Sequence, residues 1–503
     1  MILERLRRSA LLAVFLLLAA ALSECRARRR VTTVRLAQAE DLYSLDPDAA
    51  ADSRSRAVLA NVYDGLVGFD RELSVVPELA VSWTTPDDRT WEFELRPGVR
   101  FHDGRALTSA DVKFSLQRLG GGASPDLVAG FSAVEVLDEH RIRLRTVRPD
   151  PLMLNRLTQL LVVPASVHDP NVKPVGTGPY RVVARSPGRL ELEAFPQHWR
   201  GPPSFDRVVF LAIPDAEVEG ALRGHRVDVY RLLSSGAASR QAALAGYRIV
   251  GRRGLSITYL WFDCTPRREG RASPFADVRV RRAISLALDR SRIVARLGGR
   301  DLPTRQLLPK GVFGFLEERA AAPIDPEGAR RLLAEAGYSA GLELRLAHAD
   351  NDPHRILAAS VAEMLAPAGI RVAVEELRWV DLLEARRDRR LGFFVLDWTF
   401  DDGDAWTFLM ASLHRRAGPS DLRSTNPGCG NASLDRLIEE SRHAATIDDR
   451  LARYEAALRL AADDVPIVPL YDRYDAYAVA EGVEFEPRLD GKLVASEMRW
   501  RGP

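Results

Sequence analysis

The sequence predicts a mixed α/β fold, and three observations support this prediction. The chain has 503 residues, of which 46% are hydrophobic, so it can bury a large core and form about two to four domains. Some segments alternate apolar and polar residues, which is typical of half-buried strands. Others carry apolar residues three and four positions apart, which predicts helices packed on one face. Because the two kinds follow one another along the chain, strands and helices are expected to share domains.

The stretch from Trp91 to Leu119 contains both patterns. Alternation over Trp91–Leu95 predicts a strand, and Pro97-Gly98 ends it. Thr108, three residues before Asp111, predicts a helix start of the capping-box kind, and apolar residues at helical spacing continue to Leu119. No side chain in this stretch is poised to react, so we expect it to be structural.

The remaining elements follow from the same rules. Further strands are predicted over Thr33–Ala37, Arg141–Thr146, Val208–Ile213, Ser256–Phe262, Leu342–Ala347, Arg371–Glu375, Gly392–Leu396 and Ile467–Leu470. Helices are predicted after Asp277, after Asp325-Pro326 and around Leu451–Ala461, where the two aspartates are expected to act as N-caps. Their apolar stripes are interpreted as packing surfaces.

The N-terminus predicts an export signal over residues 1–24. Arg5, Arg7 and Arg8 form a basic start, and Ala10–Leu22 is an unbroken apolar run. Thirteen helical residues span only about 20 Å, which is short of a hydrocarbon core of about 30 Å. A cleaved signal is therefore favoured over a membrane anchor, and the protein is expected to be exported.

The point of cleavage has two interpretations. Leu22–Cys25 resembles a bacterial lipobox, in which Cys25 is acylated and becomes the first mature residue, although Glu24 stands where that pattern has a small residue. Ala21-Leu22-Ser23 offers an ordinary signal-peptidase site instead. The first alternative predicts a protein anchored in the cell envelope, and the second predicts a free periplasmic protein.

The other two cysteines, Cys264 and Cys429, either form a disulfide in an oxidising compartment or remain buried free thiols. The nine histidines are scattered, and neither CxxC nor HExxH occurs, so no metal site and no cofactor is predicted. The 71 basic residues are balanced by 69 acidic ones, which argues against a partner made of nucleic acid.

Seven blocks, in order, give the chain a resemblance to a known family. The stretch RPGVRFHDGRALTSADVKFSLQR resembles the RPGVxFHDGxxLTAxDVxxSLxR block of the extracellular solute-binding proteins, family 5, which serve peptide and nickel ABC importers. The other blocks are Ser44–Pro47 with Asn61–Val67, Pro77–Ala80, Val175–Tyr180, Pro274–Arg281, Ile324–Tyr338 and Asp464–Tyr471. Together they extend over nearly the whole chain after residue 30.

The resemblance implies a type II periplasmic binding protein: two α/β lobes joined by a hinge, with an extra subdomain in lobe I. By analogy, lobe I comprises residues 31–258 and 472–503, with residues 47–164 as the added subdomain, and lobe II comprises residues 259–471. The hinge is expected near Ser256–Phe262 and Leu470–Tyr474, where strand-like segments cross between the lobes.

The resemblance also indicates a ligand site. Asp397–Asp404 follows an apolar run that ends a predicted strand, and ligands of α/β sheets bind beyond the carboxyl ends of strands. Dipeptide and oligopeptide receptors have a WxxDxxDP-like segment here, whose first aspartate holds the ligand's α-ammonium group. Asp401 matches that aspartate, while Trp398 and Asp404 match the flanking positions, and Ala405 replaces the proline. The alternative is that these acids form a solvated turn.

The opposing wall is predicted in lobe I at Tyr43-Ser44-Leu45. An extended peptide would pair its backbone with protein strands, and water-filled pockets would accept varied side chains. The expected partners are the peptide ligand and the permease subunits of an ABC importer, and a monomer is expected. The residue that binds the ligand carboxylate is not identified by the sequence.

Other functions remain open. A nickel chelate, an oligosaccharide or another amine-bearing solute would suit the same family. The acid pairs Asp401/Asp404 or Asp463/Asp464 could in principle serve a glycoside hydrolase, but no nucleophile–base pattern accompanies either pair, so no catalytic residue is predicted. A third alternative is a surface lipoprotein with chaperone or signalling duty on the same fold.

Overall fold

The computed structural model describes residues 32–39, 41–50, 53–121, 127–128, 130–232, 246–265, 267–268, 271–316, 324–400, 402–415, 428–444 and 446–501. The predictions for the export signal, for Cys25 and for Asp401 lie outside the described residues. In the described part of the chain, no helix combines the length and the apolar character that crossing a membrane requires.

One large mixed sheet runs through the described molecule. Its order is β17-β16-β18-β12-β19-β11-β1-β10-β9-β8, and β15 (Leu302–Pro303) pairs with β19 at the side. In that order the strands are Ile370–Leu377, Leu342–Ala349, Phe393–Thr399, Tyr247–Phe262, Ile467–Ala480, Val229–Leu232, Thr33–Gln38, Arg207–Ala212, Arg189–Ala194 and Tyr180–Ser186. We call the part built on β1 and β8–β11 lobe I and the part built on β16–β18 lobe II. This is the two-lobed α/β fold that the resemblance implied.

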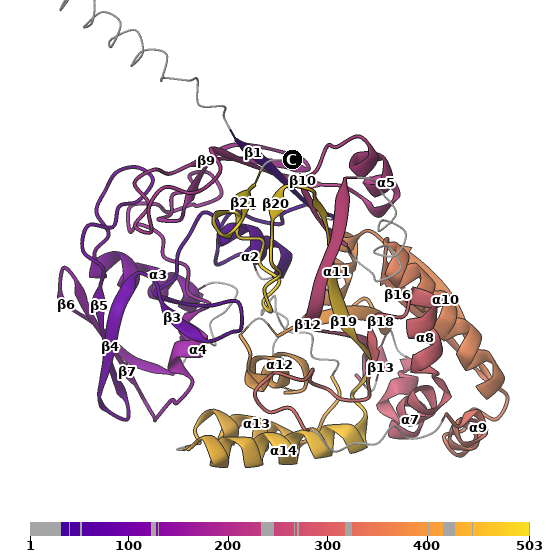
Figure 1. Cartoon of the computed structure of the whole chain (residues 1–503). Coiled ribbons are helices and arrows are strands. Elements are labelled where there is room, and N and C mark those ends of the chain that lie inside the picture. Colours follow the sequence, from indigo (N-terminus) through magenta and orange to yellow (C-terminus); the bar gives the residue numbers. More distant parts are fainter. Residues whose placement is uncertain are drawn as a thin grey trace, which may run out of the picture.

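Two long strands, β12 and β19, connect the lobes (Figure 1). The first half of β12 pairs with the part of β19 that also pairs with β11, and the second half pairs with β18. Between these halves Arg253 pairs with Tyr474 and Ile257 pairs with Asp472, so three residues of β12 face only Arg473. Such a bulge bends a strand locally. The structure therefore places its main backbone irregularity where the sheet passes between the lobes, which suits a hinge.

Lobe II buries both faces of its sheet. Along β18, Phe393 and Val395 face one core, and Phe394 and Leu396 face another. The first core is completed by α7 (Val278–Ala287), α8 (Arg290–Leu297), α9 (Pro326–Glu335) and α10 (Asp352–Leu365). The second is completed by α11 (Trp379–Arg387), α12 (Ala405–Ser412), α13 (Ala432–Arg442) and α14 (Ile447–Asp464). This double burial explains why β18 reads as a continuous apolar run.

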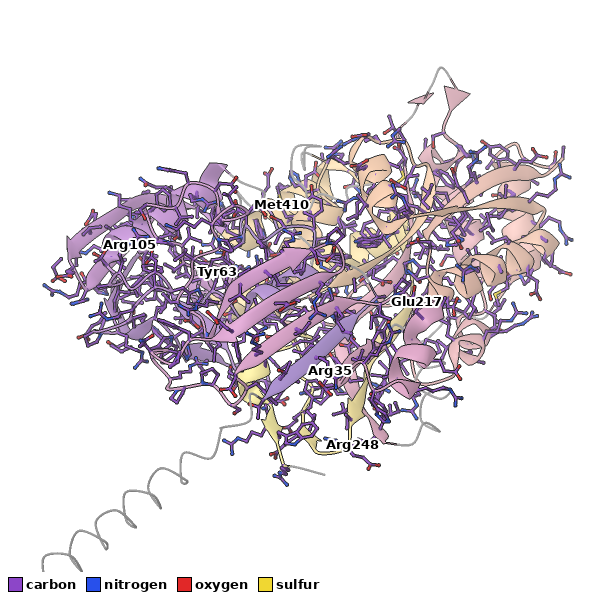
Figure 2. All side chains as sticks on the ribbon, turned by 90° about the horizontal axis from the view of Figure 1, so that it is seen from above. Arg35, Tyr63, Arg105, Glu217, Arg248 and Met410 are labelled. Atoms are coloured by element: carbon purple, nitrogen blue, oxygen red, sulfur yellow. A yellow bond between two sulfur atoms is a disulfide. The ribbon has the colours of Figure 1, made fainter. Side chains whose placement is uncertain are left out.

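Lobe I has its own core and carries the added subdomain. Helices α2 (Ser53–Leu59) and α5 (Asp215–Arg223) pack on its sheet. The subdomain has a separate sheet of order β4-β5-β7-β6, with strands Ala80–Asp87, Thr90–Leu95, Arg141–Thr146 and Phe131–Asp138, and a core shared with α3 (Ser109–Gly121) and α4 (Met153–Leu157). Figure 1 shows it on the side of the molecule opposite α7–α10, and Figure 2 shows Arg105 at this end and Met410 of α12 nearer the middle. The residue boundaries predicted for the lobes and the subdomain remain a prediction.

Short hairpins complete the described structure. They pair β2 (Val67–Phe69) with β3 (Val75–Pro77), β13 (Arg267–Arg268) with β14 (Arg271–Ala272), and β20 (Val483–Glu484) with β21 (Arg499–Trp500). Single-turn 3-10 helices occupy Pro274–Ala276, Ala366–Ala368 and Ala495–Glu497.

The local signals of the sequence have direct structural counterparts. The carboxylate of Asp277 accepts from the backbone N–H of Arg279 at the start of α7, and that of Asp325 accepts from Gly328 at the start of α9. In the first turn of α3, the carboxylate of Asp111 accepts from both the backbone N–H and the hydroxyl of Thr108, which precedes the helix, at 2.9 Å. These capping aspartates satisfy N–H groups that have no partner inside the helix, as predicted.

The two cysteines of lobe II lie next to each other. The sequence left a disulfide and two free thiols open, and the structure has the disulfide between Cys264 and Cys429, with Cα atoms 4.9 Å apart. The bond joins residues 165 positions apart in the sequence. It ties the segment after β12 to the start of the α13 region.

Candidate functional site

The candidate site lies where β16 and β18, which are parallel, reach their carboxyl ends. Trp398 and Thr399 are the last residues of β18. The half-buried indole of Trp398 contacts Phe400 and Phe408 edge-on, with ring centroids 6.5 and 5.5 Å apart. The backbone N–H of Phe400 donates to Leu255 on β12 at 2.8 Å. The loop that follows β18 is therefore held against a hinge strand.

A tight turn follows at residues 400–403. The N–H of Gly403 donates to the carbonyl of Phe400 at 3.1 Å, and Gly403 adopts a φ of +68°, which favours glycine. Asp402, inside this turn, accepts from the hydroxyl of Thr407 and from the N–H of Asp404. Asp401, the predicted ammonium anchor, stands between Phe400 and Asp402 in the sequence and lies outside the described residues, so its role stays a prediction.

Asp404 was also predicted to contact ligand, but its side chain forms its hydrogen bonds with residues of its own lobe. Its side chain caps α12 by accepting from the N–H of Trp406 at 2.6 Å. The same oxygen accepts from the Tyr454 hydroxyl at 2.6 Å and from Arg450 at 3.3 Å. The residue is only 4% exposed, and its second carboxylate oxygen is buried without a hydrogen-bond partner among the described residues. The structure thus assigns Asp404 a structural role, and its ligand contact stays a prediction.

The two residues predicted for the lobe I wall differ in environment. The hydroxyl of Ser44 donates to Asn171 at 2.8 Å, and the same amide oxygen accepts from the N–H of Leu45, so Ser44 is buried and already paired. Tyr43 is 55% exposed, and its backbone N–H donates to the hydroxyl of Ser55 at 3.0 Å. Of this pair, Tyr43 is the one whose side chain is exposed. No described contact brings it together with Trp398.

A buried polar cluster lies beside the same strand end, and the sequence did not predict it. Arg473 of β19 donates to Asp397 of β18 at 2.6 Å, and Thr258 of β12 donates to the other oxygen of Asp397 at 2.7 Å. His354 of α10 lies 3.5 Å from that carboxylate. Burial alone would raise the pKa of Asp397, but the charge of Arg473 and the contacts with His354 and Thr258 hold it well below its usual range.

This cluster borders a small cavity of about 10 Å³, lined by Thr258, Asn351, Pro353, His354, Asp397, Tyr471 and Arg473. That volume suits roughly one water molecule. The charges of Asp397 and Arg473 compensate each other, so the cluster is a paired polar group beside the hinge strands. The sequence signal that could have revealed this cluster is the presence of charged residues along β19, directly after an apolar strand segment.

The added subdomain and lobe II also meet through charged residues. An ideal Cβ on Gly130 would lie 3.4 Å from Arg442 of α13 and 3.8 Å from Arg156 of α4. Arg156 pairs with Asp150, and burial, with the nearby charges of Arg442 and Arg450, lowers the pKa of Arg156 to about 9. The subdomain and lobe II therefore lie close together at this point.

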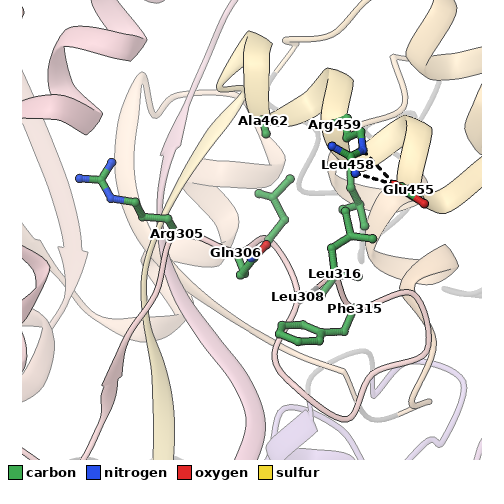
Figure 3. A pocket seen from close by; sticks show the side chains of 10 residues that line it. Arg305, Gln306, Leu308, Phe315, Leu316, Glu455, Leu458, Arg459 and Ala462 are labelled. Carbon is green, nitrogen blue, oxygen red and sulfur yellow. Dashed lines mark hydrogen bonds and ion pairs between the residues drawn. The ribbon is translucent and has the colours of Figure 1, made fainter. Parts of the chain in front are cut away.

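A larger cavity of about 310 Å³ lies in lobe II between the segment after β15 and α14 (Figure 3). Leu308, Phe315, Leu316 and Leu458 give it apolar walls, and Arg459 pairs with Glu455 at its rim at 2.6 Å. The guanidinium of Arg305 points away from the other lining residues in Figure 3. The cavity has a size typical of small-ligand sites, but none of the predicted ligand residues lines it.

The arrangement is suited to binding. Asp464, one of the acids considered for hydrolysis, pairs with Arg281 at 2.9 Å, at the end of α14. Asp404 is committed to a helix cap, and Asp397 to an arginine. In the described residues, no group of three or more histidine, cysteine or acidic side chains is arranged to hold a metal ion. Two lobes joined by a bent pair of strands, with polar groups at the strand ends between them, define a solute-binding protein.

The comparisons with known proteins identify the family. The model of the bacterial extracellular solute-binding proteins, family 5 (middle region), matches residues 74–420. The chain belongs to this family. The heme-binding protein A of Haemophilus influenzae is 26% identical to it over 470 residues, covering 85% of this chain and 82% of that protein. The dipeptide-binding protein of Escherichia coli is 25% identical over 469 residues, covering 85% and 84%.

Solved structures agree on the fold. The PBP AgaA from A. tumefaciens R10, in complex with agropinic acid, has a TM-score of 0.83 and 26% identity, covering 94% of this chain and 99% of that one. The periplasmic binding protein DppA from Helicobacter pylori, in complex with the peptide STSA, has a TM-score of 0.84, 22% identity and the same coverage. The second likeness supports the fold alone.

Proposed function

We propose that this protein is the substrate-binding component of an ABC importer and that it captures peptides between its lobes without altering them. The observation that carries the proposal is that Trp398 stands at the carboxyl end of β18 and the N–H of Gly403 donates back to Phe400, so the described residues on either side of Asp401 in the sequence lie at that strand end. Relatives whose names specify dipeptides, di- and tripeptides, and glutathione support a peptide as the solute.

The physical basis is the pairing of opposite charges at a site from which water is excluded. A carboxylate at position 401 would pair with the α-ammonium group of a peptide, and closure of the lobes would strengthen that pair by excluding water. Tyr43, exposed on lobe I, would contribute to the opposite wall. Only the closed, liganded form would present the surface that the permease recognises.

Export follows the same reasoning. A substrate-binding component works outside the cytoplasmic membrane, and the basic and apolar segments within residues 1–24 supply the signal. Acylation at Cys25 would keep the protein beside its permease, and cleavage after Ser23 would release it. Globomycin, which blocks lipoprotein signal cleavage, separates these outcomes by the mass of the processed chain.

The experiment is a thermal shift screen of the purified chain against di-, tri- and longer peptides, with heme, agropinic acid, a nickel–histidine chelate and an oligosaccharide in the same panel. Stabilisation by peptides that chromatography recovers intact supports the proposal. If only one of the other compounds stabilises the protein, that compound and not a peptide is the ligand. Cleavage of a bound compound would make the protein an enzyme.

The anchor is tested by Asp401→Asn, which keeps the shape and removes the charge. We expect a loss of about 2–5 kcal/mol in peptide binding free energy by calorimetry, because a desolvated ammonium group is left unpaired. The melting temperature of the free protein should change little. Unchanged peptide affinity would refute Asp401 as the anchor.

A further inference from the structure

The hinge strand β19 carries an aspartate on an apolar face of the sheet. Asp472 pairs with Ile257 of β12 on one side and with Leu302 of β15 on the other. Residues directly opposite each other on antiparallel strands point to the same face. Ile257 belongs to the apolar cluster that also contains Leu255 and Tyr259, so the carboxyl group of Asp472 lies on the apolar side of the hinge.

This carboxyl group is buried without compensation. Asp472 is only 9% exposed, and its Oδ1 atom has no hydrogen-bond partner among the described residues. The nearby hydroxyl of Tyr259 donates to the carbonyl of Leu307 at 2.7 Å, so it does not serve Asp472. A buried carboxylate that lacks partners is costly, whereas a protonated carboxyl group carries no charge. The described conformation therefore favours the protonated form, and burial raises the pKa of Asp472 to about 7.

Several ionisable groups flank Asp472, but only one of them favours its ionised form. They are Arg253 and Tyr259 of β12, Asp301 and Arg305 beside β15, and Arg473 of β19. Arg473 is already committed to its ion pair with Asp397, and Asp301 accepts from a backbone N–H of β19 at 2.9 Å. The charge of Arg253 is the one that opposes the effect of burial on the pKa of Asp472.

Arg253 lies on the other side of the β12 bulge. It pairs with Tyr474 in the half of β12 that adjoins lobe I, whereas Asp472 pairs with Ile257 in the half that adjoins lobe II. The side chain of Arg253 is exposed and forms no ion pair in the part of the chain that the structure describes. A change of angle at the bulge alters the separation of Arg253 and Asp472, because they belong to different sides of it.

The described conformation brings the two sides of the molecule together away from the hinge. Leu73, from the β2–β3 hairpin outside lobe II, packs against the apolar cluster that contains Trp398 and Phe400. In this conformation Asp472 is shielded from water, and Arg253 stays unpaired across the bulge. Parting of the lobes about the hinge strands is the motion that would hydrate the carboxyl group and let it pair with the arginine.

We propose that Asp472 is a proton-dependent switch in the hinge. With the proton bound, the carboxyl group favours the conformation in which the lobes are together. With the proton lost, the carboxylate favours an open conformation in which it meets water and Arg253. Closure around a solute then takes up a proton. This inference goes beyond the proposed function, because it concerns the movement of the lobes whatever the solute is.

The direction of the effect follows from linkage. The closed form holds the proton more tightly than an open form whose hydrated carboxyl group has an ordinary pKa of about 4. Affinity for a solute is therefore highest at low pH, falls as the pH rises from about 5 to 7, and levels off above that range. At pH 6 the closed form is largely protonated and the open form largely ionised, so binding takes up about one proton.

Two measurements on the mature chain test the switch. Calorimetry with trialanine between pH 5 and pH 7, in two buffers of different ionisation enthalpy, gives the affinity and the number of protons taken up. Small-angle X-ray scattering of the unliganded chain over the same range gives the radius of gyration. Asp472→Asn keeps the shape without the charge, and Arg253→Gln removes the counter-charge.

The matched control is Asp48→Asn. Burial also raises the pKa of Asp48, to about 6, but this residue lies 3.3 Å from Arg118 of α3 and not in the hinge strands. It therefore titrates in the same range without touching the proposed switch.

For the wild type we expect affinity to fall by about ten-fold or more from pH 5 to pH 7, with uptake of about one proton at pH 6. The radius of gyration should be larger at pH 7 than at pH 5. Asp472→Asn should change in affinity by less than about three-fold and keep the smaller radius throughout. Arg253→Gln should lose less affinity by pH 7 than the wild type, because its open form lacks the counter-charge. Asp48→Asn should behave as the wild type does.

The same pH dependence of affinity and radius in the wild type and in Asp472→Asn would overturn the switch. Its disappearance in Asp48→Asn would also overturn it, since the titrating group would then lie outside the hinge. If no peptide binds at any pH while the radius still responds to pH through Asp472, the switch stands and the proposed function fails.

Discussion

Arg473 of β19 and Asp397 of β18 form an ion pair at 2.6 Å, with side chains only 13% and 12% exposed. Arg473 is also the residue that faces the bulge of β12, where the sheet passes from one lobe to the other. A buried charge pair thus ties the hinge to the strand whose end carries the candidate ligand turn. This arrangement holds β18 and β19 together beside the bulge of β12.

Removing one partner of this pair should destabilise the fold strongly. We expect Asp397→Leu or Arg473→Leu to lower the free energy of unfolding by about 3–5 kcal/mol, because a charge stays buried without a partner. The double variant should lose less than the sum of the two. The exposed pair Glu343–Arg371, with side chains 75% and 78% exposed, is the matched control and should contribute at most about 1 kcal/mol. Urea unfolding measures the wild type and each variant of both pairs, and additive losses at 397 and 473 would contradict the coupling.

Asp472, at the hinge bulge, should give stability a specific pH dependence. Burial raises the pKa of Asp472 to about 7, although the charge of Arg253 opposes this. Since the folded-state pKa lies above the unfolded value of about 4, the folded protein holds the proton more tightly. The stabilisation is complete below about pH 4 and is lost as the pH rises toward 7, by up to about 1.4 kcal/mol per pKa unit.

The test of this pH dependence compares the wild type with Asp472→Asn by thermal unfolding between pH 5 and pH 8. Between pH 5 and pH 8 the melting temperature of the variant should fall less than that of the wild type, since asparagine does not titrate. An identical pH profile in both proteins would show that Asp472 is not the titrating group.

The disulfide between Cys264 and Cys429 should stabilise lobe II. It closes a long loop, so replacing both cysteines with serine should lower the free energy of unfolding by about 2–5 kcal/mol. Reductant should have the same effect on the wild type and none on the double serine variant. If reductant releases both thiols without shifting the urea midpoint, the disulfide has no stabilising role.

Asp401 and Asp404 should respond differently to the same chemical change. Asp404→Asn removes the charge that caps α12 and pairs with Arg450, so we expect a loss of about 1–3 kcal/mol in folding stability. Asp401→Asn should instead weaken peptide binding with little effect on folding. Thermal unfolding and calorimetry on both variants make the comparison, and a purely binding defect in Asp404→Asn would return that residue to the ligand site.

Much of the fold could be predicted because its signals are local. The strand at Arg141–Thr146 has the predicted bounds, and Asp277 and Asp325 cap the helices that they were expected to cap. Alternation and capping depend on neighbouring residues, so one sequence suffices to detect them. The overall two-lobed arrangement, by contrast, came from the resemblance to a family.

The hinge strands show what local patterns do not reveal. The strand rules predicted only Ile467–Leu470 of β19, and the resemblance added a crossing near Leu470–Tyr474, whereas the strand continues to Ala480 through buried Asp472 and Asp475 and half-buried Arg473. Charged residues are normally exposed, and these are buried because their surroundings include distant partners such as Asp397 and Arg231. For the same reason the sequence did not separate Asp404 from Asp401, since the pairing of Asp404 with Tyr454 exists only in the folded chain.

The central claim, capture of a peptide without chemical change, is tested most directly by native mass spectrometry of the mature chain mixed with a defined set of peptides. The account predicts a one-to-one complex from which denaturation releases a peptide of its original mass, and a much weaker complex for Asp401→Asn. Release of a shortened peptide, or no complex with any peptide while another solute from the periplasm stays bound, would contradict it.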